Sequence, residues 1–151
     1  MSLSFTPSWR TESTRILLCR AMFLFAILHI LTGLGMTWWG DSLVFETYHQ
    51  MVLTQIPNAG RTLEQVWFSL FGATLQLVGM MLLALIYCAQ KFRSAKLWTF
   101  LIVGLCLWAA QDIFLSLRYA LWLNVVVDLA ALLWSVPCLV CLVLFDREQK
   151  N

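Results

Sequence analysis

Two aspartates inside apolar segments are the first residues in this sequence that could do chemistry. Asp112 and Asp128 each lie in a long apolar stretch. A carboxyl group at the centre of a membrane helix costs about 2.5 to 3.5 kcal/mol on insertion scales, so each needs a partner. Two such groups placed together cannot both be ionised cheaply, and we expect the pair to share one proton. The pair is therefore predicted to be either a proton or ligand site or a hydrogen-bonded clamp between two helices.

Further polar side chains are expected at similar depth. By the 1.5 Å rise of a helix, His29 and Gln76 lie roughly 16 Å from the outer ends of their apolar segments. A core histidine bonded to Gln76 or to a carbonyl is the alternative to a proton relay. The candidate ligand- or proton-binding residues are His29, Gln76, Gln111, Asp112, Asn124 and Asp128, and the candidate pocket wall is Trp108.

Small residues accompany two of these polar positions. Gly33 lies one turn after His29, and Gly72 and Gly79 lie on the same stripe as Gln76. Small residues around a polar one are typical of close contacts between membrane helices. We therefore expect these stripes to be helix–helix interfaces.

The composition identifies the environment in which these residues work. Of 151 residues, 61% are hydrophobic and 12% are charged, whereas a soluble domain has about 45–50% apolar and about 25% charged residues. The lipid bilayer is therefore the first expected partner. Ten Lys and Arg against eight Asp and Glu leave a net charge of only +2, which argues against nucleic-acid binding.

Four segments are long enough to cross about 30 Å of hydrocarbon, which takes about 20 apolar residues. We predict an all-α, integral membrane four-helix bundle that forms one domain over residues 1–151. No Pro or Gly separates the last two spans, so a turn near Ser116 to Tyr119 must reverse the chain. This turn brings Asp112 and Asp128 to the same depth on neighbouring antiparallel helices. The predicted spans are 16–39, 66–87, 97–117 and 121–145.

The distribution of cations predicts the orientation. With four spans, both termini lie on one side, and eight cations share that side: Arg10, Arg15, Arg20, Lys91, Arg93, Lys96, Arg147 and Lys150. The other side has Arg61 and Arg118. By the positive-inside rule we place both termini in the cytoplasm, most simply in a bacterial inner (plasma) membrane.

The first outer loop contains a second helical pattern. Apolar residues recur at helical spacing over 42–53, opposite Glu46, His49 and Gln50. This pattern predicts an amphipathic helix in the outer interface, with His49 on its solvated face.

The sequence has five cysteines but no complete metal or redox motif. Cys138 and Cys141 have C-x-x-C spacing inside an apolar helix, where small core side chains are the favoured interpretation. We expect neither a metal ion nor another cofactor.

Three classes of function fit this pattern. We favour a non-enzymatic accessory protein or a bundle that binds a lipid or apolar small molecule at its polar layer. The alternatives are a lipid-active, isomerase-like enzyme that moves protons with the Asp pair and His29, and a small proton-coupled transporter. Four helices hardly enclose a pathway, so the transporter needs a homo- or hetero-oligomer.

Overall fold

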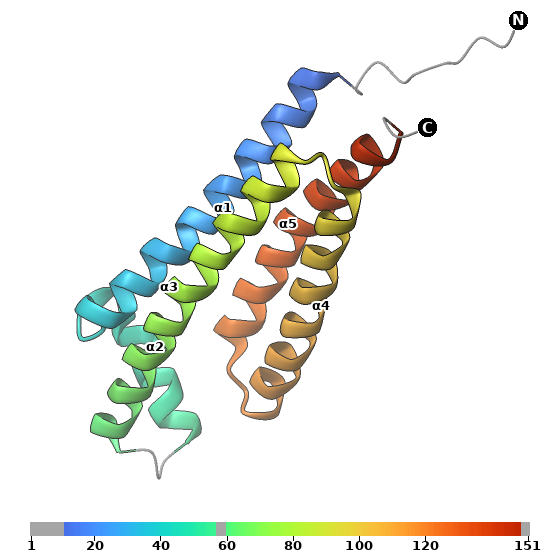
Figure 1. Cartoon of the computed structure of the whole chain (residues 1–151). Coiled ribbons are helices and arrows are strands. Elements are labelled where there is room, and N and C mark those ends of the chain that lie inside the picture. The colour runs from blue at the N-terminus through green and yellow to red at the C-terminus, as the bar shows by residue number, and fades with distance from the viewer. Residues whose placement is uncertain (1–10, 57–59, 149–151) are drawn as a thin grey trace, which may run out of the picture.

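The computed structural model describes residues 11–56 and 60–148, which fold into five helices (Figure 1). Four of them, all except α2, are long and apolar enough to cross a membrane. They cover the four predicted spans except for Leu121, and they extend beyond most of the predicted ends. The helices are α1 (Glu12–Trp39), α2 (Leu43–Gln55), α3 (Arg61–Lys91), α4 (Ala95–Arg118) and α5 (Trp122–Glu148).

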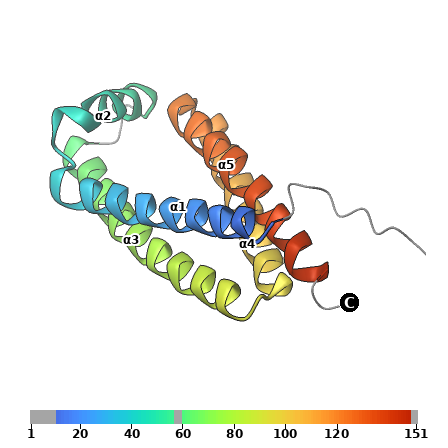
Figure 2. The same cartoon turned by 90° about the horizontal axis from the view of Figure 1, so that it is seen from above.

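The four long helices form two antiparallel pairs. α1 packs along α3 and α4 packs along α5, and lesser contacts of α1 with α5 and of α3 with α4 join the pairs. We call the end with Glu12, the 92–94 turn and Glu148 the terminal end, and the end with α2 and the 119–121 turn the loop end. The pairs meet at the terminal end and diverge toward the loop end, where α2 lies beside them (Figures 1 and 2).

Glycines allow α1 and α3 to approach closely. A Cβ atom added at Gly33 would lie 2.5 Å from the carbonyl oxygen of Gly72, and one at Gly72 would lie 2.7 Å from that of Gly33. At Gly79, an added Cβ would meet the side chain of Ile30 at 2.6 Å. The predicted interhelical role of these small residues is confirmed.

The largest apolar core lies toward the terminal end, where the two pairs meet. It is built from side chains of all four long helices. Its fully buried large members are Met22, Ile86, Trp98, Leu139 and Leu142. This packing fixes the pairs at one end and leaves their loop-end halves further apart.

Both turns between the long helices end in the same way. Ser94 N donates to Ala89 O at 3.1 Å, and Leu121 N donates to Ser116 O at 2.8 Å. This bond between residues five apart is the Schellman pattern, which requires a left-handed residue just before the donor. Arg93 (φ 44°) and Ala120 (φ 54°) occupy that position. The predicted reversal near residues 116–119 is confirmed.

Candidate functional site

A buried ion pair joins the helices at the terminal end. Arg15 Nε donates to Asp146 Oδ1 at 2.8 Å, and Arg15 Nη2 donates to Asp146 Oδ2 at 3.2 Å. Trp98 Nε1 donates to the same Oδ2 at 2.8 Å, and Arg15 Nη2 also donates to Gln90 O at 3.2 Å. We call Arg15, Trp98 and Asp146 the terminal clamp. Because Asp146 is 0% exposed and has three donors, its charge is fully compensated.

The sequence did not indicate this clamp. In the sequence, Arg15 precedes the first predicted span as one of several cations, and Asp146 follows the last predicted span. The available signal was an arginine and an aspartate at the same end of the first and last apolar segments.

Asp128, in the loop-end half of α5, has a different environment. It is only 3% exposed, and among the described residues its Oδ2 has no hydrogen-bond partner. Asp112 of α4 is half-buried and close enough to interact electrostatically with Asp128. The antiparallel turn thus places the two acids on the neighbouring helices α4 and α5, within electrostatic range of each other.

Tyr48 brings α2 to these acids. Its hydroxyl group is hydrogen-bonded with the side chain of Asn124 on α5. Burial raises the pKa of Tyr48, the bond from Asn124 opposes this, and the nearby Glu64, Asp112 and Asp128 add to the increase. We call Tyr48, Asp112, Asn124 and Asp128 the acid site. It gathers polar side chains from α2, α4 and α5.

The other predicted site residues bond elsewhere. His29 Nδ1 donates to Phe25 O at 2.9 Å, on its own helix, and Gln76 Nε2 donates to Thr37 Oγ1 of α1 at 2.9 Å. Gln111 is exposed and donates to Leu107 O at 3.0 Å, while Trp108 is half-buried. The divergence of the helix pairs explains why the α1 and α3 residues bond within their own pair.

The prediction that His49 lies on a solvated face is wrong. It is 0% exposed, its Nδ1 lies 2.7 Å from both carboxylate oxygens of Glu64, and its Nε2 lies 2.8 Å from Gly40 O. With both ring nitrogens within hydrogen-bond distance of carboxylate or carbonyl oxygens, this geometry favours an imidazolium, in which both nitrogens donate. Burial lowers the pKa of His49, but the bonds to Gly40 and Glu64 outweigh it, and the pKa lies above its ordinary value.

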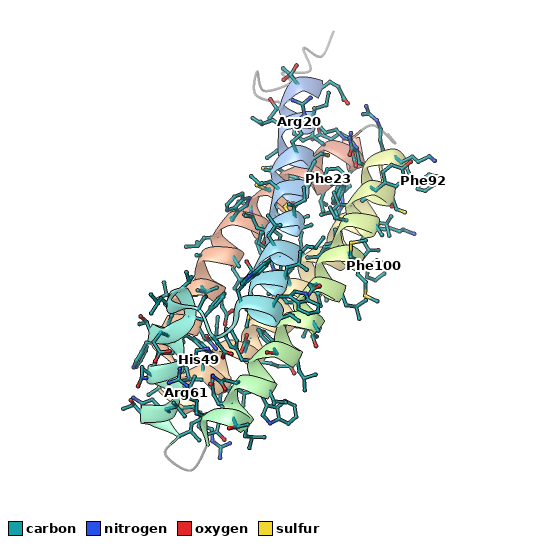
Figure 3. The ribbon with its side chains drawn as sticks, turned by 90° about the vertical axis from the view of Figure 1, so that its left-hand side faces the viewer. Arg20, Phe23, His49, Arg61, Phe92 and Phe100 are labelled. Carbon is teal, nitrogen blue, oxygen red and sulfur yellow. The ribbon has the colours of Figure 1, made fainter. Side chains whose placement is uncertain are left out.

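The position of the partner of His49 explains why the helical pattern did not predict that His49 is buried. Glu64 lies on α3, fifteen residues further along the chain. The spacing within 42–53 predicted Glu46 and Gln50 on one side of the helix, and Gln50 Nε2 donates to Glu46 Oε1 at 2.7 Å. It could not show that α3 covers one member of that side. Figure 3 shows His49 with Arg61 at the loop end, far from Arg20.

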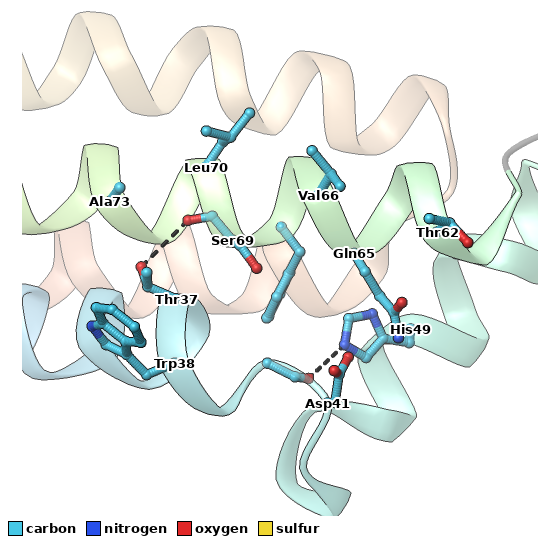
Figure 4. Close-up of a pocket in the computed structure, with 12 residues that line it drawn as sticks. Thr37, Trp38, Asp41, His49, Thr62, Gln65, Val66, Ser69, Leu70 and Ala73 are labelled. Carbon is cyan, nitrogen blue, oxygen red and sulfur yellow. Dashed lines mark hydrogen bonds between the residues drawn. The ribbon is translucent and has the colours of Figure 1, made fainter.

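A groove of about 430 Å³ opens beside His49 (Figure 4). It lies between the end of α1 and the beginning of α3, and it does not include the acid site. The residues that line it are Thr37, Trp38, Gly40, Asp41, His49, Thr62, Gln65, Val66, Phe68, Ser69, Leu70 and Ala73.

Within residues 11–56 and 60–148, no group of three or more His, Cys, Asp or Glu side chains could hold a metal ion. Cys138 and Cys141 are half-buried thiols of α5. No protein-family model matches the chain, and comparison with curated proteins and with solved structures finds no match either.

Proposed function

We propose that this membrane protein binds an apolar small molecule or lipid at the acid site, through a hydroxyl or ammonium group of the ligand. The observation that carries the proposal is Asp128 Oδ2, a buried oxygen without a partner among the described residues. Buried polar atoms are almost always hydrogen-bonded, and leaving one unpaired costs about 1 to 3 kcal/mol. A donor group of a ligand compensates this cost.

The acid site favours a ligand group that donates hydrogen bonds over one that accepts them. Carboxylates accept hydrogen bonds, and Asp112 adds a second carboxyl group beside Asp128. An ammonium group also offsets the repulsion between the two acids, whereas a ligand carboxylate increases it. The surrounding helices expose mainly apolar side chains, among them Val127 and Leu129. These features favour a ligand that has an apolar body and one donor group.

The proposal also includes a membrane and an orientation of the chain in it. Following the positive-inside rule, we place the terminal end and both termini in the cytoplasm of a bacterium, with the chain in its inner membrane. The loop end then faces outward and α2 lies as an amphipathic helix in the outer interface. A ligand dissolved in the outer leaflet reaches the acid site from this side.

The enzyme and transporter alternatives lack a comparable observation. The enzyme hypothesis needs His29 beside the acid pair, whereas His29 bonds to Phe25 on its own helix. The transporter needs further subunits to enclose a pathway. A binding role requires only the unpaired acceptor.

Three twelve-carbon probes test the proposal: dodecylamine, dodecanol and dodecanoic acid. We expect the amine, and to a smaller extent the alcohol, to raise the thermal midpoint of the detergent-purified protein. A probe at about 100 times its Kd stabilises by about 2.7 kcal/mol. The acid should give no shift beyond that of a detergent-like chain. Asp128→Asn should abolish the difference between amine and acid.

Gln111→Leu is the matched control, because Gln111 is exposed on α4 and donates to Leu107 O of the same helix. It should leave the amine response unchanged. An Asp128→Asn variant that responds to the amine like the unmodified protein contradicts the proposal. A double Asp112→Asn, Asp128→Asn variant that unfolds readily supports the structural clamp instead.

A further inference from the structure

The groove beside His49 is separate from the acid site and has a shape of its own. Along α3, Thr62, Gln65, Ser69 and Ala73 follow one another every three or four residues, so they line one face of that helix. Trp38, at the end of α1, lies along the groove and is 73% exposed. Figure 4 shows these side chains along the two helices. The groove therefore runs lengthwise from the loop end into the span.

Its polarity changes along its length. The loop end carries Asp41, Thr62 and Gln65, and the deeper end carries Leu70 and Ala73. Thr62 and Ala73 are separated by roughly 16 Å along the helix. A polar mouth at the end of a span and an apolar channel within the span match a lipid headgroup followed by an acyl chain.

The charges at the mouth favour a cation. Its two cations are already paired: Arg61 Nη2 lies 2.8 Å from Glu46 Oε2, and His49 binds Glu64. Among the described residues that line the groove, Asp41 is exposed and carries the charge outside these two pairs, with Arg61 in electrostatic range of it. Figure 4 shows Asp41 next to His49 at the mouth.

We propose that this groove binds a phospholipid with a primary ammonium headgroup. The ammonium donates to the Asp41 carboxylate, and the hydroxyl of Thr62 and the amide of Gln65 bond the neighbouring polar atoms. The acyl chain lies along Leu70 and Ala73, with the Trp38 ring as one wall. Ammonium and carboxylate form a charge-assisted hydrogen bond, which a quaternary headgroup cannot make because it has no N–H.

Native mass spectrometry of the detergent-purified chain tests this site. Dioleoyl phosphatidylethanolamine, phosphatidylcholine and phosphatidylglycerol are added separately at equal concentrations. We expect the ethanolamine lipid to bind about tenfold more tightly than the choline lipid, which has the same chains and phosphate. Asp41→Asn should reduce this preference to about onefold, and the glycerol lipid should bind no better than the choline lipid.

Two leucine substitutions on α3 test the position of the chain. Ala73→Leu fills the groove and should weaken binding of all three lipids, whereas Thr74→Leu, next to it outside the groove, should not. Both positions are exposed, so neither change disturbs the core. Equal binding of the ethanolamine and choline lipids, a preference that survives Asp41→Asn, or an inert Ala73→Leu would each overturn the proposal. Asp128→Asn should leave lipid preference unchanged, which separates this site from the acid site.

Discussion

The two ends of α5 each contain a buried aspartate, and the two have opposite environments. Asp146 at the terminal end accepts bonds from Arg15 and Trp98, donors on two other helices. Asp128 toward the loop end has a carboxyl neighbour and an oxygen without a partner among residues 11–56 and 60–148. Burial of the same residue type therefore comes with full hydrogen bonding at one end and, among the described residues, with an unpaired acceptor at the other.

The packing follows the same division. The core and the terminal clamp hold the helix pairs together where the chain begins and ends, while the loop-end halves diverge. A fully compensated charge suits a fixed joint, because removing either partner leaves the other charge buried. Under the proposed function, a donor group of a ligand completes the unpaired acceptor of Asp128.

The largest expected effect comes from breaking the terminal clamp. Asp146→Asn removes the charge opposite buried Arg15, and we expect it to cost about 3 to 5 kcal/mol, as for other buried ion pairs that lose one partner. The measurement is the thermal midpoint in detergent. Asp128→Asn serves as the matched comparison on the same helix and should change stability far less. Equal losses at the two positions would remove the distinction between the ends.

Crowding the α1–α3 contact is expected to have the next largest effect. Leucine at Gly72 would force a side chain against the backbone of Gly33, where even a Cβ atom lies at 2.7 Å. We expect a loss of about 1 to 3 kcal/mol from overpacking. Gly104→Leu on α4 is the control, because a Cβ there meets nothing within 4 Å. If the two variants have the same thermal midpoint, close packing at the glycines does not hold α1 and α3 together.

The His49–Glu64 bond should make the attachment of α2 depend on pH. The pKa of His49 is raised in the folded protein, so its contribution is complete below the ordinary value of about 6.5 and is lost as the pH rises through the raised value. Glu64 and Gly40 favour the charged ring, and Arg61 opposes it.

We therefore expect the thermal midpoint to fall as the pH rises above the ordinary His value of about 6.5. His49→Gln should flatten this dependence, whereas His29→Gln should retain it. Cross-linking of α2 to α5 through cysteines at positions 48 and 124 reports the same loss locally. A midpoint that rises with pH in the unmodified protein would contradict the imidazolium assignment.

Local patterns predicted the features that depend on neighbouring residues. Apolar length predicted four long apolar helices, the turn predicted Asp112 and Asp128 on neighbouring antiparallel helices, and helical spacing predicted the glycine contacts of the first pair. The partners of Arg15 and His49 were missed, because each lies on a different helix. Arg15 and Asp146 are separated by 131 positions, and no periodicity within a segment connects them.

The smallest expected effect concerns the two Schellman turns, one at each end of the molecule. Ala120 and Arg93 both hold left-handed backbone, which costs a residue with a side chain about 1 to 2 kcal/mol relative to glycine. Replacement by glycine also destabilises the folded protein by about 0.4 to 1 kcal/mol, because glycine gives the unfolded chain more conformational freedom. Ala120→Gly at the loop end should therefore stabilise by up to about 1.5 kcal/mol.

Arg93→Gly at the terminal end should gain less, because Arg93 Nη2 also bonds Glu12 Oε1 at 2.7 Å. An exposed ion pair contributes about 0.2 to 1 kcal/mol, which offsets the relief of the backbone. Arg93→Gly combined with Glu12→Gln separates these contributions when thermal midpoints of single and double variants are compared. A larger gain at residue 93 than at residue 120 would show that the charges around the terminal end do not help to hold it together.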